Sequence, residues 1–166
     1  MTQFDPRAYG PVFAPLLDVD RRRPLDAGVP IAKARHALGG VSAKSAFAHA
    51  VRSVADRDMA SCCIAGVWLL FDELDESHTI TQSIKSESGS FWHAIMHRRE
   101  GDFSNAKYWF RHVGVHPTFD RLAKRTSELA TTAGRADVLQ RLAPRGAWDP
   151  YAFVDLCQRA QCEEGP

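Results

Sequence analysis

The residues best suited to chemistry are two histidines one helical turn apart. His93, His97 and Glu100 fall within about 60° of one another on a helix that turns about 100° per residue, so they share one stripe. Two imidazoles spaced in this way can bind zinc or another transition metal together. The residue after the first histidine is Ala94 rather than glutamate, so the pattern does not match the HExxH motif of zinc proteases.

Further ionisable residues precede and follow this pair. A carboxylate from Glu73 or Glu76, or the imidazole of His78, would complete a metal shell. Without a metal, His93 or His97 can act as a general acid or base near neutral pH. A third alternative is a structural network of ion pairs. The sequence leaves these three alternatives open and defines one candidate pocket, whose members are Glu73, Glu76, His78, His93, His97, Arg99 and Glu100.

The acidic residues of this pocket follow a strongly apolar segment, which predicts a central helix over about residues 56–77. Its apolar side chains surround nearly the whole circumference, as is typical of a helix covered by neighbours on several sides. The acidic cluster 72–76 lies at the carboxyl end of this predicted helix, where the helix dipole disfavours anions. We therefore expect the cluster to face the basic residues of the next helix, from His93 to Arg99.

Aromatic residues are concentrated between positions 91 and 110. Most such rings in a helical hairpin belong to the core, but Trp92 and Trp109 do not both fit on the same side as Phe110. An exposed tryptophan beside an arginine would anchor a peptide, a protein or another copy of the chain, because these residue types are enriched at interface hot spots. The predicted partner-binding residues are Trp92, Trp109 and Arg111.

The region from about 90 to 117 contains the residue order of one helical repeat. Gly101 with Asp102 ends one helix and caps the next, while Ala106 and Phe110, one turn apart, pair a small residue with an aromatic ring. This stretch resembles a tetratricopeptide-repeat hairpin, and the resemblance implies two antiparallel helices. Segments 72–82 and 92–114 together resemble a family of bacterial and fungal proteins of unknown activity, which implies no catalytic role.

The first helix of the hairpin departs from the repeat pattern. His93 and His97 stand near the positions where the repeat usually places Leu and Tyr in the seam between helices. The resemblance covers about one repeat, whereas a stable solenoid needs about three or more. We therefore interpret the stretch as a single hairpin within a small helical protein.

Length and charge restrict the class of protein. The 166 residues fit one domain with a substantial core. The 21 basic and 20 acidic residues nearly cancel, which argues against nucleic-acid binding by phosphate neutralisation. The amino terminus lacks a signal-peptide pattern, and the longest uncharged run, 59–71, is shorter than the roughly 20 residues needed to cross a bilayer. We expect a soluble, cytoplasmic protein that does not bind membranes.

The remaining segments predict an all-α fold of stacked antiparallel helices. Residues 1–30 contain five of the nine prolines and predict an arm packed on a helical domain, 31–166. Short helices are expected over 31–51, with a break at 39–40 and an N-cap at Ser42, and further helices at about 89–100, 103–113, 117–132, 135–143 and 149–162. We predict a binding or interaction module for a protein, peptide or small molecule; the alternative is a metal-binding protein or enzyme that uses the candidate pocket.

Overall fold

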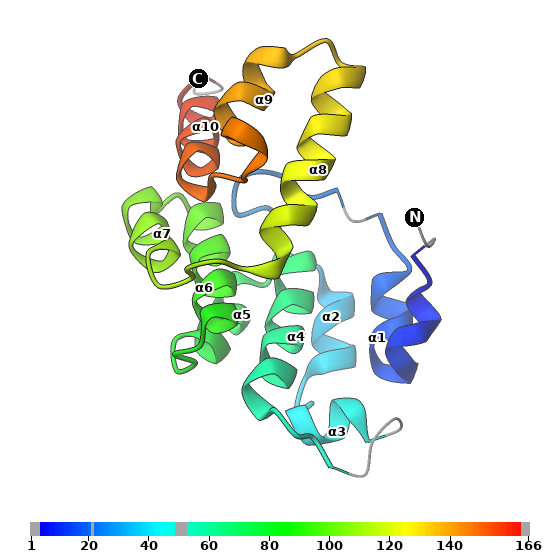
Figure 1. The fold of residues 1–166 in the computed structure, drawn as a ribbon. Coiled ribbons are helices and arrows are strands. Elements are labelled where there is room, and N and C mark those ends of the chain that lie inside the picture. Colours follow the sequence, from blue (N-terminus) through cyan, green and yellow to red (C-terminus); the bar gives the residue numbers. More distant parts are fainter. Residues whose placement is uncertain (1–3, 21, 49–52, 164–166) are drawn as a thin grey trace.

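The computed structural model describes residues 4–20, 22–48 and 53–163, which form ten α-helices, two short 3-10 helices and no strand. The helices pack into one domain (Figure 1), so the prediction of a single all-α domain is confirmed. The helices are α1 (Gly10–Leu17), α2 (Ala32–Leu38), α3 (Ala43–Phe47), α4 (Arg57–Leu70), α5 (Leu74–Thr81), α6 (Glu87–Glu100), α7 (Phe103–Phe110), α8 (Pro117–Thr132), α9 (Ala136–Leu142) and α10 (Pro150–Glu163).

The amino-terminal half packs around α4, which contacts α1, α2, α3, α5 and α6. This arrangement explains why apolar residues surround α4. The core of this half consists of buried side chains from the first four helices, including Phe13, Leu16, Leu38, Ile64 and Trp68. Because Phe13 and Leu16 of α1 belong to this core, part of the Pro-rich segment 1–30 contributes directly to the packing of the domain.

The short helices α2 and α3 follow the sequence pattern closely. α2 ends before Gly39, and the hydroxyl of Ser42 accepts a hydrogen bond from the backbone N–H of Ser45 at the start of α3. The Ser45 hydroxyl accepts from the Ser42 N–H in return, which completes a capping box. The predicted segment 31–51 extends further than these helices, and its residues 49–51 lie outside the described part of the chain.

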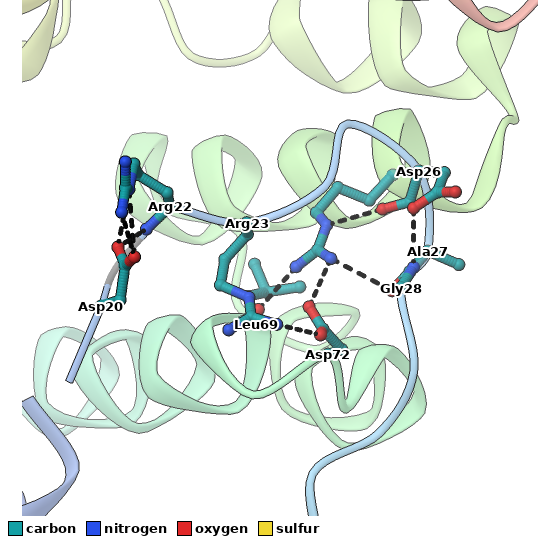
Figure 2. Close-up of polar contacts among 9 residues, drawn as sticks. Asp20, Arg22, Arg23, Asp26, Ala27, Gly28, Leu69 and Asp72 are labelled. Atoms are coloured by element: carbon teal, nitrogen blue, oxygen red, sulfur yellow. Dashed lines mark hydrogen bonds and ion pairs between the residues drawn. The ribbon is translucent and has the colours of Figure 1, made fainter. Parts of the chain in front are cut away.

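The prediction of one continuous helix over 56–77 is wrong, because the chain turns between α4 and α5. Helix α4 ends at Leu70, and Asp72 takes a left-handed backbone conformation with φ 61°. This conformation is uncommon for any residue other than glycine. The Asp72 side chain is buried and accepts hydrogen bonds from Arg99 and Arg23 (Figure 2), so contacts from distant segments stabilise the turn.

The predicted break at Gly101 joins α6 to α7. Gly101 has φ 89°, and the carboxylate of Asp102 accepts a hydrogen bond from the backbone N–H of Asn105 at 3.0 Å. The two helices pack closely, with Ala106 fully buried in their seam. Helix α7 ends at Phe110 rather than near 113. A second core cluster forms here from Phe91, Ala94, Ala106, Phe110, Val113 and Val154 of α10.

The last three helices form the opposite end of the molecule. Helix α8 runs from the α6–α7 region to α9, and α10 returns to pack against α7 and α9 (Figure 1). Pro117 occupies the first turn of α8, as the sequence predicts. Among the described helices, none combines the length and the apolar character that crossing a membrane requires.

Candidate functional site

Three histidines from two helices meet beside the α6–α7 hairpin. His78 comes from α5, and His93 and His97 come from successive turns of α6. One ring nitrogen of each lies within 4.8 Å of a ring nitrogen of the other two. His93 and His97 are buried, and His78 is half-buried. The structure therefore brings together the two histidines of the predicted stripe and one of the three groups considered for completing the shell.

The hydrogen bonds around His93 favour one of the two neutral tautomers of its ring. The hydroxyl of Thr81 donates to the backbone carbonyl of Ser77 at 2.9 Å, so its oxygen is left to accept from His93 Nδ1 at 2.8 Å. A neutral imidazole carries one proton. When the Thr81 hydroxyl donates to Ser77, the proton of the neutral ring is on Nδ1 and the lone pair of Nε2 is available to an electrophile.

The same tautomer follows for His97 from a different partner. Its Nδ1 lies 2.5 Å from the carboxylate of Glu100, and a carboxylate accepts hydrogen bonds only, so Nδ1 carries a proton. The amide of Asn105 on α7 donates to His97 Nε2 at 3.0 Å. Both buried imidazoles therefore have Nδ1 oriented by a neighbouring oxygen and Nε2 in the accepting state, as in metal-ligating histidines.

Burial keeps His93 uncharged near neutral pH. The side chain is removed from water, and the nearby His97 and His78 add to the cost of a positive charge, so the pKa of His93 falls to about 4. The ring of Trp109 on α7 covers it, with the two ring centroids 4.2 Å apart. A neutral imidazole with a free lone pair is the form that binds a metal ion.

The donor set fits a borderline metal such as zinc. Zinc accepts imidazole nitrogen at about 2.0 to 2.1 Å, so tetrahedral ligands lie about 3.3 Å apart. The separations of up to 4.8 Å mean that the rings must move by about an ångström to share one ion. Asn105 must also release His97 Nε2, which a side-chain rotation achieves.

A second group of potential ligands adjoins the first at the end of α6. His97, Glu100 and Asp102 also place one donor atom each within 4.8 Å of one another. The two carboxylate residues are exposed, and Asp102 already caps α7. Since His97 belongs to both groups, the exposed acids form the solvent side of the histidine cluster.

No protein-family model, curated protein or solved structure matches this chain. The geometry of the side chains therefore carries the functional argument by itself.

The acidic residues of the candidate pocket lie away from the histidine cluster or at its edge. Glu73 is buried and forms a two-pronged ion pair with Arg35 of α2, at 2.7 and 2.8 Å. Glu76 is exposed on α5. Among the described residues, the group of potential metal ligands that includes a residue of α5 contains His78 and neither of these acids. Glu100 is the one carboxylate of the candidate pocket that bonds to a clustered histidine.

Arg99 serves a different site from the histidines, although it lies on the same helix. Its guanidinium donates to the backbone carbonyls of Leu69, Asp26 and Ala27 and to the carboxylate of Asp72 (Figure 2). These contacts hold the segment before α2 against the turn between α4 and α5. The acidic end of α4 therefore faces α6 through Asp72 and Arg99, whereas Glu73 faces α2.

The predicted partner-binding residues occupy different environments. Trp92 is half-buried against α4, where a methyl group on Gly66 would lie 2.8 Å from its ring. Trp109 is half-buried against His93. Arg111 is exposed, and its guanidinium lies over the ring of Tyr108, 5.4 Å from the centroid.

Two residues that orient the histidines were not among the sequence candidates. Thr81 and Asn105 hydrogen-bond to the rings of His93 and His97. Thr81 lies one turn after His78 on the same face of α5, and Asn105 follows the predicted cap at Asp102 by one turn. Helical spacing places both in the right region, but threonine and asparagine are too common as hydrogen-bonding residues to single them out.

Proposed function

We propose that this protein binds a transition metal ion, with His78, His93 and His97 as its ligands. The observation that carries the proposal is the convergence of three imidazoles, of which the two buried members each have Nδ1 within hydrogen-bond distance of a side-chain oxygen. Three histidines and one open position are typical of catalytic zinc sites, whereas structural zinc sites use four protein ligands.

The surrounding residues would determine how the metal behaves. Bound zinc supplies a Lewis acid and lowers the pKa of a coordinated water. The carboxylate of Glu100 would orient the ring of His97, and the hydroxyl of Thr81 would orient the ring of His93. Trp109 shields His93 from water. This arrangement supports metal-dependent hydrolysis or hydration more than a structural role for the ion.

Metal analysis of untagged protein tests the proposal. We expect about one metal ion per chain after purification without chelators, and its loss in His93→Ala and His97→Ala with the helical content retained. His36→Ala is the matched control, because His36 is exposed on α2 and far from the cluster in the sequence. Added zinc at 100 times its Kd should stabilise metal-free wild type by about 2.7 kcal/mol. Absence of metal together with no saturable zinc binding would refute the proposal.

A second candidate function is an interaction module on the α6–α7 hairpin, which we propose as the repeat-like unit. The supporting observation is the exposed pair of Tyr108 and Arg111 at the end of α7, where the Arg111 guanidinium lies over the Tyr108 ring and Trp109 is adjacent. Tyrosine and arginine are typical anchors of interfaces. If this surface binds another copy of the chain, light scattering will show an oligomer that Tyr108→Ser/Arg111→Ser converts to monomer; a monomeric wild type would exclude self-association.

A further inference from the structure

His116 joins the start of α8 to α6 through one face and both nitrogens of its ring. Its Nδ1 accepts a hydrogen bond from the backbone N–H of Thr118 at 3.3 Å and so caps α8. Its Nε2 lies 3.2 Å from the hydroxyl oxygen of Ser88 on α6. The ring stacks on Phe91, with centroids 4.5 Å apart and planes 5° from parallel. One half-buried side chain therefore connects two helices that are separate in sequence.

The cap at Thr118 fixes the tautomer of His116. Because Nδ1 accepts from the backbone N–H, the single proton of the neutral ring is on Nε2, which donates to the Ser88 oxygen. His116 in this state cannot take a proton from Ser88, so the pair is not an activated nucleophile. Its role depends on the neutral ring.

Protonation of His116 is incompatible with these contacts. A proton on Nδ1 would point at the Thr118 N–H, so two donors would face each other. The amino terminus of α8 also carries the positive end of the helix dipole, which disfavours a cation there. Glu87 of α6 is the charged residue that opposes this effect, and Asp120 in the first turn of α8 is exposed. Burial is the larger influence, and the pKa of His116 is below its ordinary value.

We propose that His116 forms an acid-sensitive contact between α8 and α6. Protonation of its ring releases the first turn of α8 from Ser88 and Phe91 of α6. The contact stabilises the folded state fully at pH values above the ordinary histidine pKa of about 6.5. This contribution is lost as the pH falls through the lower pKa of His116 in the folded state. The opening is local. Helix α10 remains packed against α7, so acid frees the linker 111–116 and the start of α8 without detaching the carboxyl-terminal helices.

Hydrogen exchange of the Thr118 amide directly measures how often its hydrogen bond to His116 opens. In wild-type protein with chelator present, its protection factor should fall about tenfold for each pH unit below about 6.5, until the folded pKa is reached. The Ala106 amide, which bonds to the Asp102 carbonyl at the start of α7, is the internal reference and should keep its protection. Equal losses at both amides, or none at Thr118, would overturn the proposal.

His116→Asn is the decisive variant. Asparagine caps helices well through its side-chain oxygen and does not titrate, so Thr118 should keep its protection at pH 5. In Ser88→Ala the cap remains and the acid response should persist. A direct titration keeps the test independent of both variants: the His116 ring and the Thr118 amide signals of wild-type protein should change with the same midpoint, and separate midpoints would overturn the proposal.

Discussion

Arg99 of α6 donates a hydrogen bond to the carboxylate of Asp72, 2.5 Å away, at the turn between α4 and α5. Both side chains are almost completely buried, with 4% and 1% of their surfaces exposed. The same guanidinium donates to the carbonyl of Leu69 in the last turn of α4, which also accepts from the backbone N–H of Asp72 at 3.2 Å. The pair thus stabilises both the helix end and the left-handed residue that follows it.

Removing the arginine should destabilise the protein strongly. Arg99→Met leaves the Asp72 carboxylate buried with Arg23 as its remaining ion-pair partner, and breaking a buried pair in this way costs about 3 to 5 kcal/mol. Urea unfolding followed by circular dichroism gives the free energy of unfolding. The matched control is Arg22→Met, which removes an exposed pair with Asp20 (Figure 2) and should cause no measurable change. Equal stability of the two variants would contradict the structural role of Arg99.

A methyl group at Gly28 should be harmful because of the same carboxylate. A Cβ atom there would lie 2.7 Å from Asp72 Cγ, and the backbone has φ +70°. Gly40 has φ +75° but no atom within 4 Å of its Cβ position, so it separates the two effects. We expect Gly40→Ala to cost about 1 to 2 kcal/mol through backbone strain alone. Gly28→Ala should cost measurably more, and equal losses in thermal unfolding would show that Asp72 moves aside freely.

The break at Asp72 also shows why the sequence misplaced one helix. Residues 56–77 have a continuous helical pattern of apolar side chains, and Leu74 extends the stripe past Leu70. The break has no glycine or proline signal. Its stabilising partner, Arg99, lies 27 residues further along the chain, so local sequence contains no indication of the contact. By contrast, Ser42, Gly101 and Pro117 mark their helix boundaries through short-range chemistry, and these boundaries were predicted.

The candidate site likewise has one part that local sequence predicts and another part that depends on contacts between helices. The spacing of His93, His97 and Glu100 on one helix is a local property, and the structure has all three on one face of α6. Which group from α5 joins them depends on how the helices pack. The sequence offered Glu73, Glu76 and His78 as alternatives, and only the packing of α5 on α6 selects the histidine.

The seam of the α6–α7 hairpin should not accept a larger side chain. Ala106 has no exposed surface and packs in the second core cluster, so Ala106→Leu should lower the free energy of unfolding by about 1 to 3 kcal/mol. The control is Ala37→Leu on α2, where the alanine is exposed and the change should stay within about 0.5 kcal/mol. Denaturant unfolding distinguishes the two. A neutral Ala106→Leu would mean that the two helices separate easily.

The buried imidazole of His93 should make metal-free protein less stable in acid. Its pKa in the folded state is about 4, below the unfolded value of about 6.5, so the unfolded chain binds the proton first. The stabilising contribution is complete above about pH 6.5 and is lost as the pH falls towards 4. His93→Gln cannot titrate, so with chelator present it should lose less stability than wild type between pH 7 and 4. Carboxylates titrate in both proteins and cancel in this comparison.

His36→Gln, which alters an exposed imidazole on α2, should follow the wild-type pH dependence. Urea unfolding at a series of pH values measures the difference, and parallel curves for wild type and His93→Gln would show that His93 is not held neutral by burial.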